Sequence, residues 1–296
     1  MSSGLVWGRD GDDWPNRDHS RFVLADGMRW HVQVMGQGPT MLLLHGAGAS
    51  THSWRELAPL LAERFTVIAP DLPGHGFTSR PLRGGEGLAV AAAGLDSLLD
   101  CLSLQPTVVL GHSAGAAIGA RMLLDQPDSA GVLISINGAM LPLPGLSSRL
   151  YGPAARLLAD NPVAPLLIAL RARGGGMVER LLERTGSTLC AESIGYYKRL
   201  ARSSGHIGGV LAMMAQWDLQ SLARDLPKLS ASVWLLVGQR DGLVPPSEAE
   251  RVLSVLPSGR TVEFPGLGHL AHEEAPQTVA TAVLDAAMSE GILKVS

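Results

Sequence analysis

The chain has 296 residues, of which 46% are hydrophobic, so it can bury a large core and matches the size of one sizeable α/β domain. Its 24 Lys and Arg residues against 27 Asp and Glu residues give a net charge of −3, which provides no overall field to attract nucleic acid. Two cysteines, Cys101 and Cys190, are too few for a disulfide framework and lack metal-ligand spacing, so we expect a cytoplasmic protein with free thiols.

The sequence contains no predicted targeting or membrane-spanning segment. Residues 1–13 are glycine-rich and acidic, unlike the basic start and apolar run of a secretory signal. The apolar stretch 161–170 is interrupted by proline and is far shorter than the roughly 20 residues that span a bilayer. These features do not exclude peripheral contact with a membrane surface.

The N-terminal part predicts a short antiparallel meander. Three β-prone runs, residues 21–25, 29–35 and 40–44, are separated by Asp26-Gly27 and by Gly36-Gln37-Gly38-Pro39. Glycine and proline in these positions are typical of turns between strands.

After the meander the pattern changes to strands that alternate with helices. Short Val/Ile/Leu runs predict strands at 66–69, 107–110 and 131–136, and longer periodic stretches predict helices at 88–101 and 114–125. Such alternation indicates a parallel sheet with helices on both faces.

Strand patterns then disappear between about residues 138 and 227, where the sequence is rich in Leu, Ala and Arg. They return at 232–237 and 260–264, with helices predicted at 247–255 and 275–288. We therefore predict one core domain, residues 1–137 and 228–296, into which a helical cap of residues 138–227 is inserted.

The strongest motif is Gly111-His112-Ser113-Ala114-Gly115, which follows a predicted strand and opens a helix of small residues. In this context the pattern is typical of a nucleophile elbow, a tight turn that exposes a serine hydroxyl above a sheet. The alternative is a glycine-rich turn without chemistry. We predict that Ser113 is a nucleophile.

A serine nucleophile needs a base and a group that orients the base. Asp241 and His269 each follow a predicted strand, in the order serine, acid, base, at the strand ends where sites of open α/β sheets are built. His272 is the rival base and is expected at the start of the last helix. The loop after Ile136 could supply an acid, but it carries the uncharged Asn137.

Acyl transfer also needs donors for an oxyanion. His45-Gly46-Ala47-Gly48 follows an apolar strand, so the Ala47 amide can approach the substrate, and the Ala114 amide directly follows the nucleophile. We expect His45 to bond neighbouring loop backbone, and His112 to pack beside the nucleophile or line the pocket.

The sequence predicts neither a metal site nor a cofactor. His75 lies in a turn-rich segment with no second ligand at metal spacing. Neither a phosphate-binding loop nor a dinucleotide fingerprint occurs in its required context.

These landmarks together resemble the α/β-hydrolase superfamily over almost the whole chain. The resemblance implies an α/β fold with a mostly parallel eight-stranded sheet, flanked by helices, and a helical cap inserted after the sixth strand. Ser113 departs from the haloalkane dehalogenases and epoxide hydrolases, relatives that use an aspartate at this place, so the resemblance disfavours those two activities.

Several further segments resemble the BchO family of magnesium-chelatase accessory proteins of bacteriochlorophyll biosynthesis. The resemblance implies a pathway, with magnesium-chelatase subunits as partners and a tetrapyrrole as a ligand. It rests on residues 13–17, 20–23, 29–33, 51–55 and 134–139.

The predicted cap lies over the serine and is expected to select the substrate. Its many Leu and Met residues suit a large apolar ester or a tetrapyrrole, although ordinary packing within the cap also explains them and is the favoured explanation. Arg171, Arg173, Arg180 and Arg184 could pair with substrate carboxylates or form a solvated helix face. The candidate pocket comprises His45, His112, Asn137, Tyr196, Tyr197 and Trp217.

Three functions remain open from the sequence. The first is a serine hydrolase in pigment synthesis. The second is a protein that binds a tetrapyrrole or a chelatase subunit without catalysis. The third is a carboxylesterase or carbon–carbon bond hydrolase outside that pathway.

Overall fold

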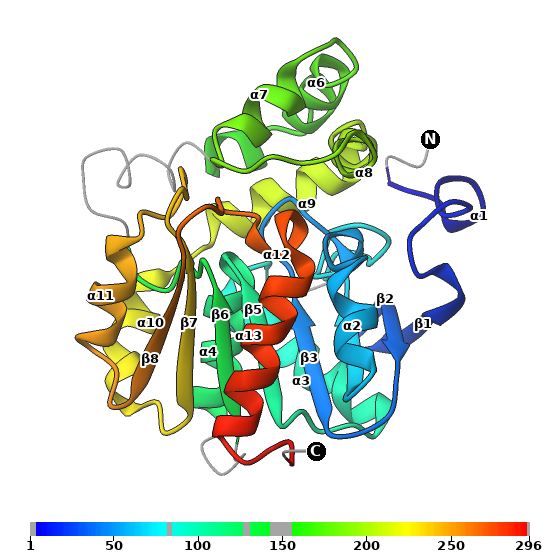
Figure 1. Cartoon of the computed structure of the whole chain (residues 1–296). Coiled ribbons are helices and arrows are strands. Elements are labelled where there is room, and N and C mark those ends of the chain that lie inside the picture. Colours follow the sequence, from blue (N-terminus) through cyan, green and yellow to red (C-terminus); the bar gives the residue numbers. More distant parts are fainter. Residues whose placement is uncertain (1–3, 82–84, 127–130, 143–155, 295–296) are drawn as a thin grey trace.

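A single eight-stranded sheet forms the centre of the molecule in a computed structural model that describes residues 4–81, 85–126, 131–142 and 156–294 (Figure 1). The strand order is β1-β2-β4-β3-β5-β6-β7-β8. The first strands pair antiparallel, and all pairs from β4 to β8 are parallel, which confirms the predicted fold class. The strands are β1 Ser20–Ala25, β2 Met28–Met35, β3 Thr40–Leu44, β4 Thr66–Pro70, β5 Val108–His112, β6 Val132–Ile136, β7 Ser232–Gly238 and β8 Gly259–Phe264.

The inner strands are covered on both faces, which explains their apolar sequences. All five residues of β5 and of β6 are buried, as are four of the five in β3. Parallel strands buried on both sides favour continuous Val, Ile and Leu runs rather than alternating polar and apolar residues.

Helices form a layer on each face of the sheet. One layer contains α3 Leu88–Leu102, α4 Ala114–Asp125, α10 Leu219–Asp225 and α11 Ser247–Leu253. The other contains α2 Leu57–Ala62, α12 Ala271–Glu274 and α13 Pro276–Ser289. Two separate apolar clusters, one on each side of the sheet, make up the core.

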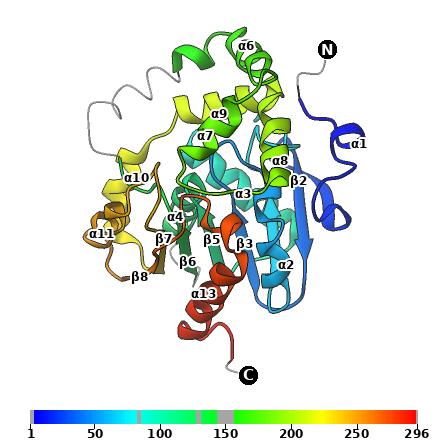
Figure 2. The ribbon, with the colours of Figure 1, turned by 45° about the horizontal axis from the view of Figure 1, so that its top comes forward.

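Within the described part of the segment between β6 and β7, the helices α6 to α9 lie over the carboxyl edge of the sheet, and we call them the cap helices (Figures 1 and 2). They are α6 Ala164–Arg171, α7 Met177–Glu183, α8 Ala191–Ala201 and α9 Ser204–Ala215. The next helix, α10, lies within the predicted insertion but packs on α4, with Leu222 fully buried in the core. The division into core and cap at residues 138 and 227 stays a prediction.

The N-terminal segment packs against the cap helices rather than against the sheet alone. It contains α1 Trp7–Asp10 and the short helix η1 Arg17–His19. Trp14 forms a buried cluster with Phe77, Tyr196 and Leu200, of which the last two belong to α8. None of the helices in the described ranges combines the length and apolar character needed to cross a membrane.

Candidate active site

Ser113 occupies a strained turn between β5 and α4. Its φ and ψ are 50° and −115°, a combination that non-glycine residues rarely adopt. The flanking glycines are required by close contacts. A Cβ at Gly111 would lie 2.5 Å from the Ala116 nitrogen, and one at Gly115 would lie 2.0 Å from the Leu44 oxygen. The turn leaves Ser113 partly exposed while both neighbours are buried.

Asp241 and His269 form a buried hydrogen-bonded pair. His269 Nδ1 donates to Asp241 Oδ2 at 2.7 Å. Asp241 Oδ1 accepts the amides of Leu243 and Val244 at 2.7 and 2.9 Å, so the carboxylate is fixed by its own loop. A donor at Nδ1 leaves Nε2 as the basic nitrogen.

The Ser113 hydroxyl and His269 Nε2 make no hydrogen bond to any described residue, or to each other. Both groups are therefore available to a substrate. In enzymes of this mechanism the bond between nucleophile and base is often long until substrate binds.

His112 joins the serine turn to the base. Its Nε2 donates to the His269 carbonyl at 2.9 Å, and the two rings lie 4.7 Å apart. A Cβ at Gly46 would lie 2.8 Å from His112 Nδ1 and 3.2 Å from the Ser113 Cβ. Three loops, those of Gly46, Ser113 and His269, thus meet at His112, and burial lowers the pKa of His112 well below its ordinary value.

Two backbone amides near the serine turn have no acceptor among the described residues: that of Ala114, which directly follows Ser113, and that of Ala47, next to Gly46 in the loop that approaches Ser113. Ala114 is the first residue of α4, where amides lack intrahelical partners and the helix dipole favours negative charge. His45 holds the other loop, since its Nδ1 donates to the Gly46 carbonyl at 2.8 Å and its Nε2 accepts the Leu72 amide at 2.9 Å. Burial lowers the pKa of His45, which favours the neutral ring that can donate through one nitrogen and accept through the other.

Asn137 fixes the base loop. Its Nδ2 donates to the carbonyls of Gly268 and His269, both at 2.9 Å, and its Oδ1 accepts the Gly238 amide at 2.7 Å. The side chain therefore links the ends of β6 and β7 to the loop that carries His269. Its left-handed φ of 46°, directly after a buried strand, is the only local sign of this role.

A segment between α7 and α8 contacts both the acid loop and the base loop. The Thr185 carbonyl accepts the amides of Gly242 and His269 at 3.2 and 3.0 Å. Ser187 Oγ accepts the Leu270 amide at 2.8 Å. Sequence reasoning missed this segment, because Thr185-Gly186 resembles an ordinary helix end.

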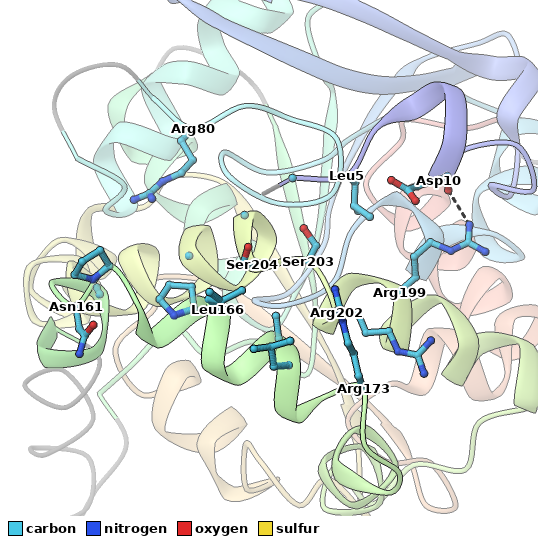
Figure 3. A pocket seen from close by; sticks show the side chains of 18 of the residues that line it. Leu5, Asp10, Arg80, Asn161, Leu166, Arg173, Arg199, Arg202, Ser203 and Ser204 are labelled. Carbon is cyan, nitrogen blue, oxygen red and sulfur yellow. Dashed lines mark hydrogen bonds between the residues drawn. The ribbon is translucent and has the colours of Figure 1, made fainter. Parts of the chain in front are cut away.

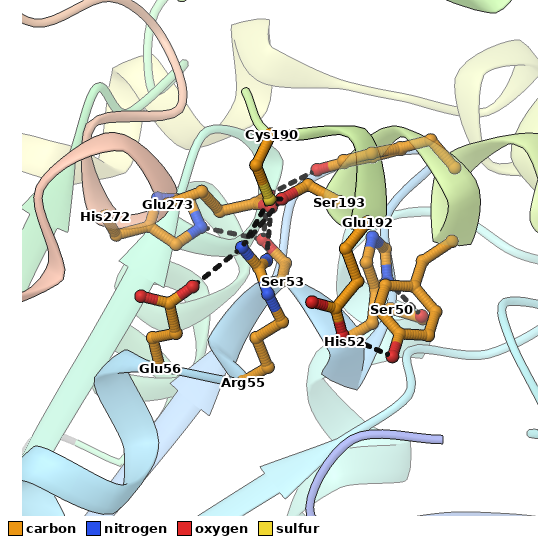
Figure 4. Close-up of polar contacts among 12 residues, drawn as sticks. Ser50, His52, Ser53, Arg55, Glu56, Cys190, Glu192, Ser193, His272 and Glu273 are labelled. Atoms are coloured by element: carbon orange, nitrogen blue, oxygen red, sulfur yellow. Dashed lines mark hydrogen bonds and ion pairs between the residues drawn. The ribbon is translucent and has the colours of Figure 1, made fainter. Parts of the chain in front are cut away.

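A buried charge cluster lies where α8 meets the core (Figure 4). Glu273 accepts hydrogen bonds from Tyr197 Oη at 2.6 Å, from Ser53 Oγ at 2.8 Å and from Arg55 at 3.1 Å. Arg55 also donates to Ser193 Oγ at 2.7 Å. Burial raises the pKa of Glu273 and, well above its ordinary value, that of Tyr197.

His272, the rival base, is held in this region. Since Ser53 Oγ gives its proton to Glu273, it accepts from His272 Nε2 at 2.7 Å. The ring centroid lies 4.6 Å from that of Trp54, with the two rings tilted by 40°, and burial lowers the pKa of His272 to about 3. We assign it no role in catalysis.

The structure does not bring the three aromatic residues of the predicted pocket into contact with the triad. Tyr196 donates to the Asp13 carbonyl at 3.2 Å and packs edge-on against Trp14. Tyr197 belongs to the buried charge cluster, and Trp217 packs against the core on the α4 side of the sheet. We leave all three out of the proposed site.

Histidines are unusually concentrated in the interior. Eight of the nine are buried, yet within the described ranges no three His, Cys, Asp or Glu side chains are grouped as metal ligands. His75 donates to the Pro73 carbonyl at 3.0 Å, as a loop residue does.

Comparison with known proteins identifies the fold family and relatives of this chain. The alpha/beta hydrolase fold family model matches residues 39–276. The magnesium-chelatase 30 kDa subunit of Rhodobacter capsulatus is 36% identical over 275 residues, which cover 92% of this chain and 96% of that one. Among solved structures, an alpha/beta hydrolase fold protein from Burkholderia ambifaria has a TM-score of 0.77 at 22% identity, covering 90% of this chain and 98% of its own. The epoxide hydrolase CorEH without ligand has a TM-score of 0.75 at 25% identity, covering 91% and 98%.

Proposed function

The chain belongs to the alpha/beta hydrolase fold family, as a relative of the magnesium-chelatase 30 kDa subunit, and we propose that it is a serine hydrolase that cleaves an ester. One observation carries the proposal. The Asp241–His269 pair is linked through His112 to a strained serine turn, and within the described residues the basic nitrogen of His269 and the amides of Ala47 and Ala114 have no partner.

In the proposed reaction the Ser113 oxygen attacks the ester carbonyl while His269 Nε2 takes the hydroxyl proton. The amides of Ala47 and Ala114 hold the negative oxygen, and Asp241 stabilises the imidazolium. Collapse breaks the bond to the alcohol, which receives the proton from His269. His269 then activates water, which releases the acid and restores Ser113.

The choice of an ester follows from the nucleophile. Haloalkane dehalogenases and epoxide hydrolases of this superfamily use a carboxylate, which forms an ester that water can open. A serine hydroxyl that attacked an alkyl carbon would form an ether, which this machinery has no means to cleave. Thioester and carbon–carbon bond cleavage pass through the same oxyanion but receive no specific support from the residues.

The similarity to a magnesium-chelatase subunit supports a place in bacteriochlorophyll biosynthesis at the magnesium-chelatase step. We propose that the substrate is a small molecule, a tetrapyrrole or another large apolar ester, and that chelatase subunits are partners. In this role the protein would act in the cytoplasm and could contact a membrane peripherally. The proposed reaction needs no bound cofactor.

A fluorophosphonate probe tests the chemistry without knowledge of the substrate. Wild-type protein and a Ser254→Ala control, altered at an exposed serine, are expected to react at equal rates, and Ser113→Ala is expected not to react. Equal labelling of Ser113→Ala and wild type would refute the serine mechanism. In a photosynthetic bacterium that lacks the gene, full restoration of pigment by Ser113→Ala would show that the role is non-catalytic.

A further inference from the structure

A cavity of about 1170 Å³ lies outside the candidate active site (Figure 3). Its walls come from the N-terminal segment, the loop after β4, α6, the end of α8 and the start of α9. None of Ser113, Asp241 and His269 lines it. Its volume is at or above the upper end of the range for small-molecule sites, which indicates a large ligand.

The cavity is lined by more cationic than anionic side chains, although the chain is acidic overall. Five arginines and two aspartates, Asp10 and Asp160, line it. Three of these arginines are neutralised in the protein. They are Arg9, Arg80 and Arg199, which pair with Asp10, Glu86 and Asp13.

Arg173 and Arg202 make no ion pair or side-chain hydrogen bond within the part of the chain that the structure describes. Both lie on the same side of the cavity in Figure 3, with Arg80 on the other. A free guanidinium offers paired donors that match a carboxylate in a bidentate arrangement. Asp160 is the one lining carboxylate without an ion pair among the described residues, so the two guanidinium groups outnumber it and favour a ligand that carries negative charge on two groups.

One wall of the cavity is apolar. It is formed largely by α6 and the turn before it, with Pro162, Pro165, Leu166 and Leu170. Leu166 and Leu170 are 49% and 46% exposed, so a ligand there would cover apolar surface that no described residue covers. The ligand therefore needs a large apolar body beside its charges.

We propose that this cavity binds a large apolar molecule that carries two carboxylates. The concave shape favours one discrete molecule over a bilayer surface, which would contact a flat or convex face. The proposal does not depend on the chemistry of Ser113.

The cavity and the proposed oxyanion loop share one wall, the helix α9. Ser204 and Gly208 of α9 line the cavity, whereas the buried His206 of the same helix contacts the Gly48 carbonyl at 3.2 Å. The proposed ligand therefore binds next to the active site without entering it.

Protoporphyrin IX, an apolar macrocycle with two propionates, is a suitable probe, and its dimethyl ester is the matched neutral probe. Binding is measured by porphyrin fluorescence at one fixed, low detergent concentration. Wild type is expected to bind the diacid at least tenfold more tightly than the diester. Arg173→Gln combined with Arg202→Gln is expected to weaken diacid binding at least tenfold.

Two controls match these changes. Arg171→Gln with Arg180→Gln alters exposed arginines that do not line the cavity, and it should leave binding within twofold of wild type. Leu170→Asn should weaken binding at least fivefold, whereas Leu181→Asn, on the exposed side of α7, should not.

Equal binding of diacid and diester, or equal binding by the two double variants, would overturn the proposal. The proposal would also be overturned if the Arg173→Gln, Arg202→Gln double variant lost co-sedimentation with phosphatidylglycerol vesicles but bound the diacid like wild type. The two arginines would then bind a membrane surface. Ser113→Ala is expected to bind the diacid like wild type. A failure of the hydrolase proposal therefore leaves this result unchanged.

Discussion

The Thr185 carbonyl accepts a hydrogen bond from the His269 amide at 3.0 Å. Thr185 lies between two cap helices, and its carbonyl also accepts the Gly242 amide, next to Asp241, at 3.2 Å. A single carbonyl between cap helices thus holds the loops of both the proposed base and the proposed acid. We expect the cap to position the catalytic pair as well as to select the substrate.

Gly186→Ala should disturb this arrangement. Gly186 has a φ of +74°, and a Cβ there would lie 1.8 Å from the Arg240 carbonyl oxygen, so the backbone must move. We expect a loss of about 1–3 kcal/mol in the free energy of unfolding, as for other strained backbone positions. The fluorophosphonate labelling rate should also fall, because the Asp241–His269 geometry shifts.

Gly175→Ala is the matched control, since it lies between α6 and α7 with nothing within 4 Å of its Cβ position. Urea unfolding and labelling rates measure both effects. An unchanged labelling rate in folded Gly186→Ala would show that the contact does not position the base.

Asp241→Asn should slow fluorophosphonate labelling by about 10³-fold or more. The amide can donate to His269 Nδ1 and thereby favour the wrong tautomer, and it cannot stabilise an imidazolium. Because Asp241 Oδ1 accepts two amides of its own loop, the fold should be retained. Circular dichroism checks the fold, and Asp100→Asn, at an exposed aspartate, should label like wild type. Labelling of Asp241→Asn at the wild-type rate would show that Asp241 is not the third member of a catalytic triad with Ser113 and His269.

The fold was largely predictable because strands and motifs are local. The eight strand positions follow from apolar runs, and Asp241 and His269 are each adjacent to a strand end. The contacts that organise the site are not local. Thr185 is 84 residues from His269, and Arg55 is 218 residues from Glu273, and no periodic pattern links such partners. For the same reason the packing of α10 on α4 could not be read from its amphipathic sequence.

Arg55→Met should destabilise the protein by about 3–5 kcal/mol, because it leaves the Glu273 carboxylate buried without its cation. Tyr197→Phe removes one hydrogen bond to the same carboxylate and should cost about 1.5–3 kcal/mol. Urea unfolding of each variant measures these losses.

The double variant Arg55→Met with Glu273→Gln tests whether the unpaired buried carboxylate causes the loss of stability. Since it removes both charges, it should recover much of the stability lost in Arg55→Met alone. If the double variant is as unstable as the sum of its two single variants, the charge pair is not the source of the loss.

Stability should fall as the solution is acidified below about pH 6.5, the ordinary pKa of histidine. Burial lowers the pKa of His206 to about 4 and that of His272 to about 3. Between those values and 6.5 the unfolded chain binds protons that the folded chain does not, so each such histidine removes about 1.4 kcal/mol of stability per pH unit. Between pH 6 and 4.5 the free energy of urea unfolding should decline less steeply in His272→Gln than in wild type. The difference in slope should be about 1.4 kcal/mol per pH unit, which corresponds to one proton. The exposed His19→Gln should not change it. An unchanged slope in His272→Gln would show that His272 titrates alike in the folded and unfolded states.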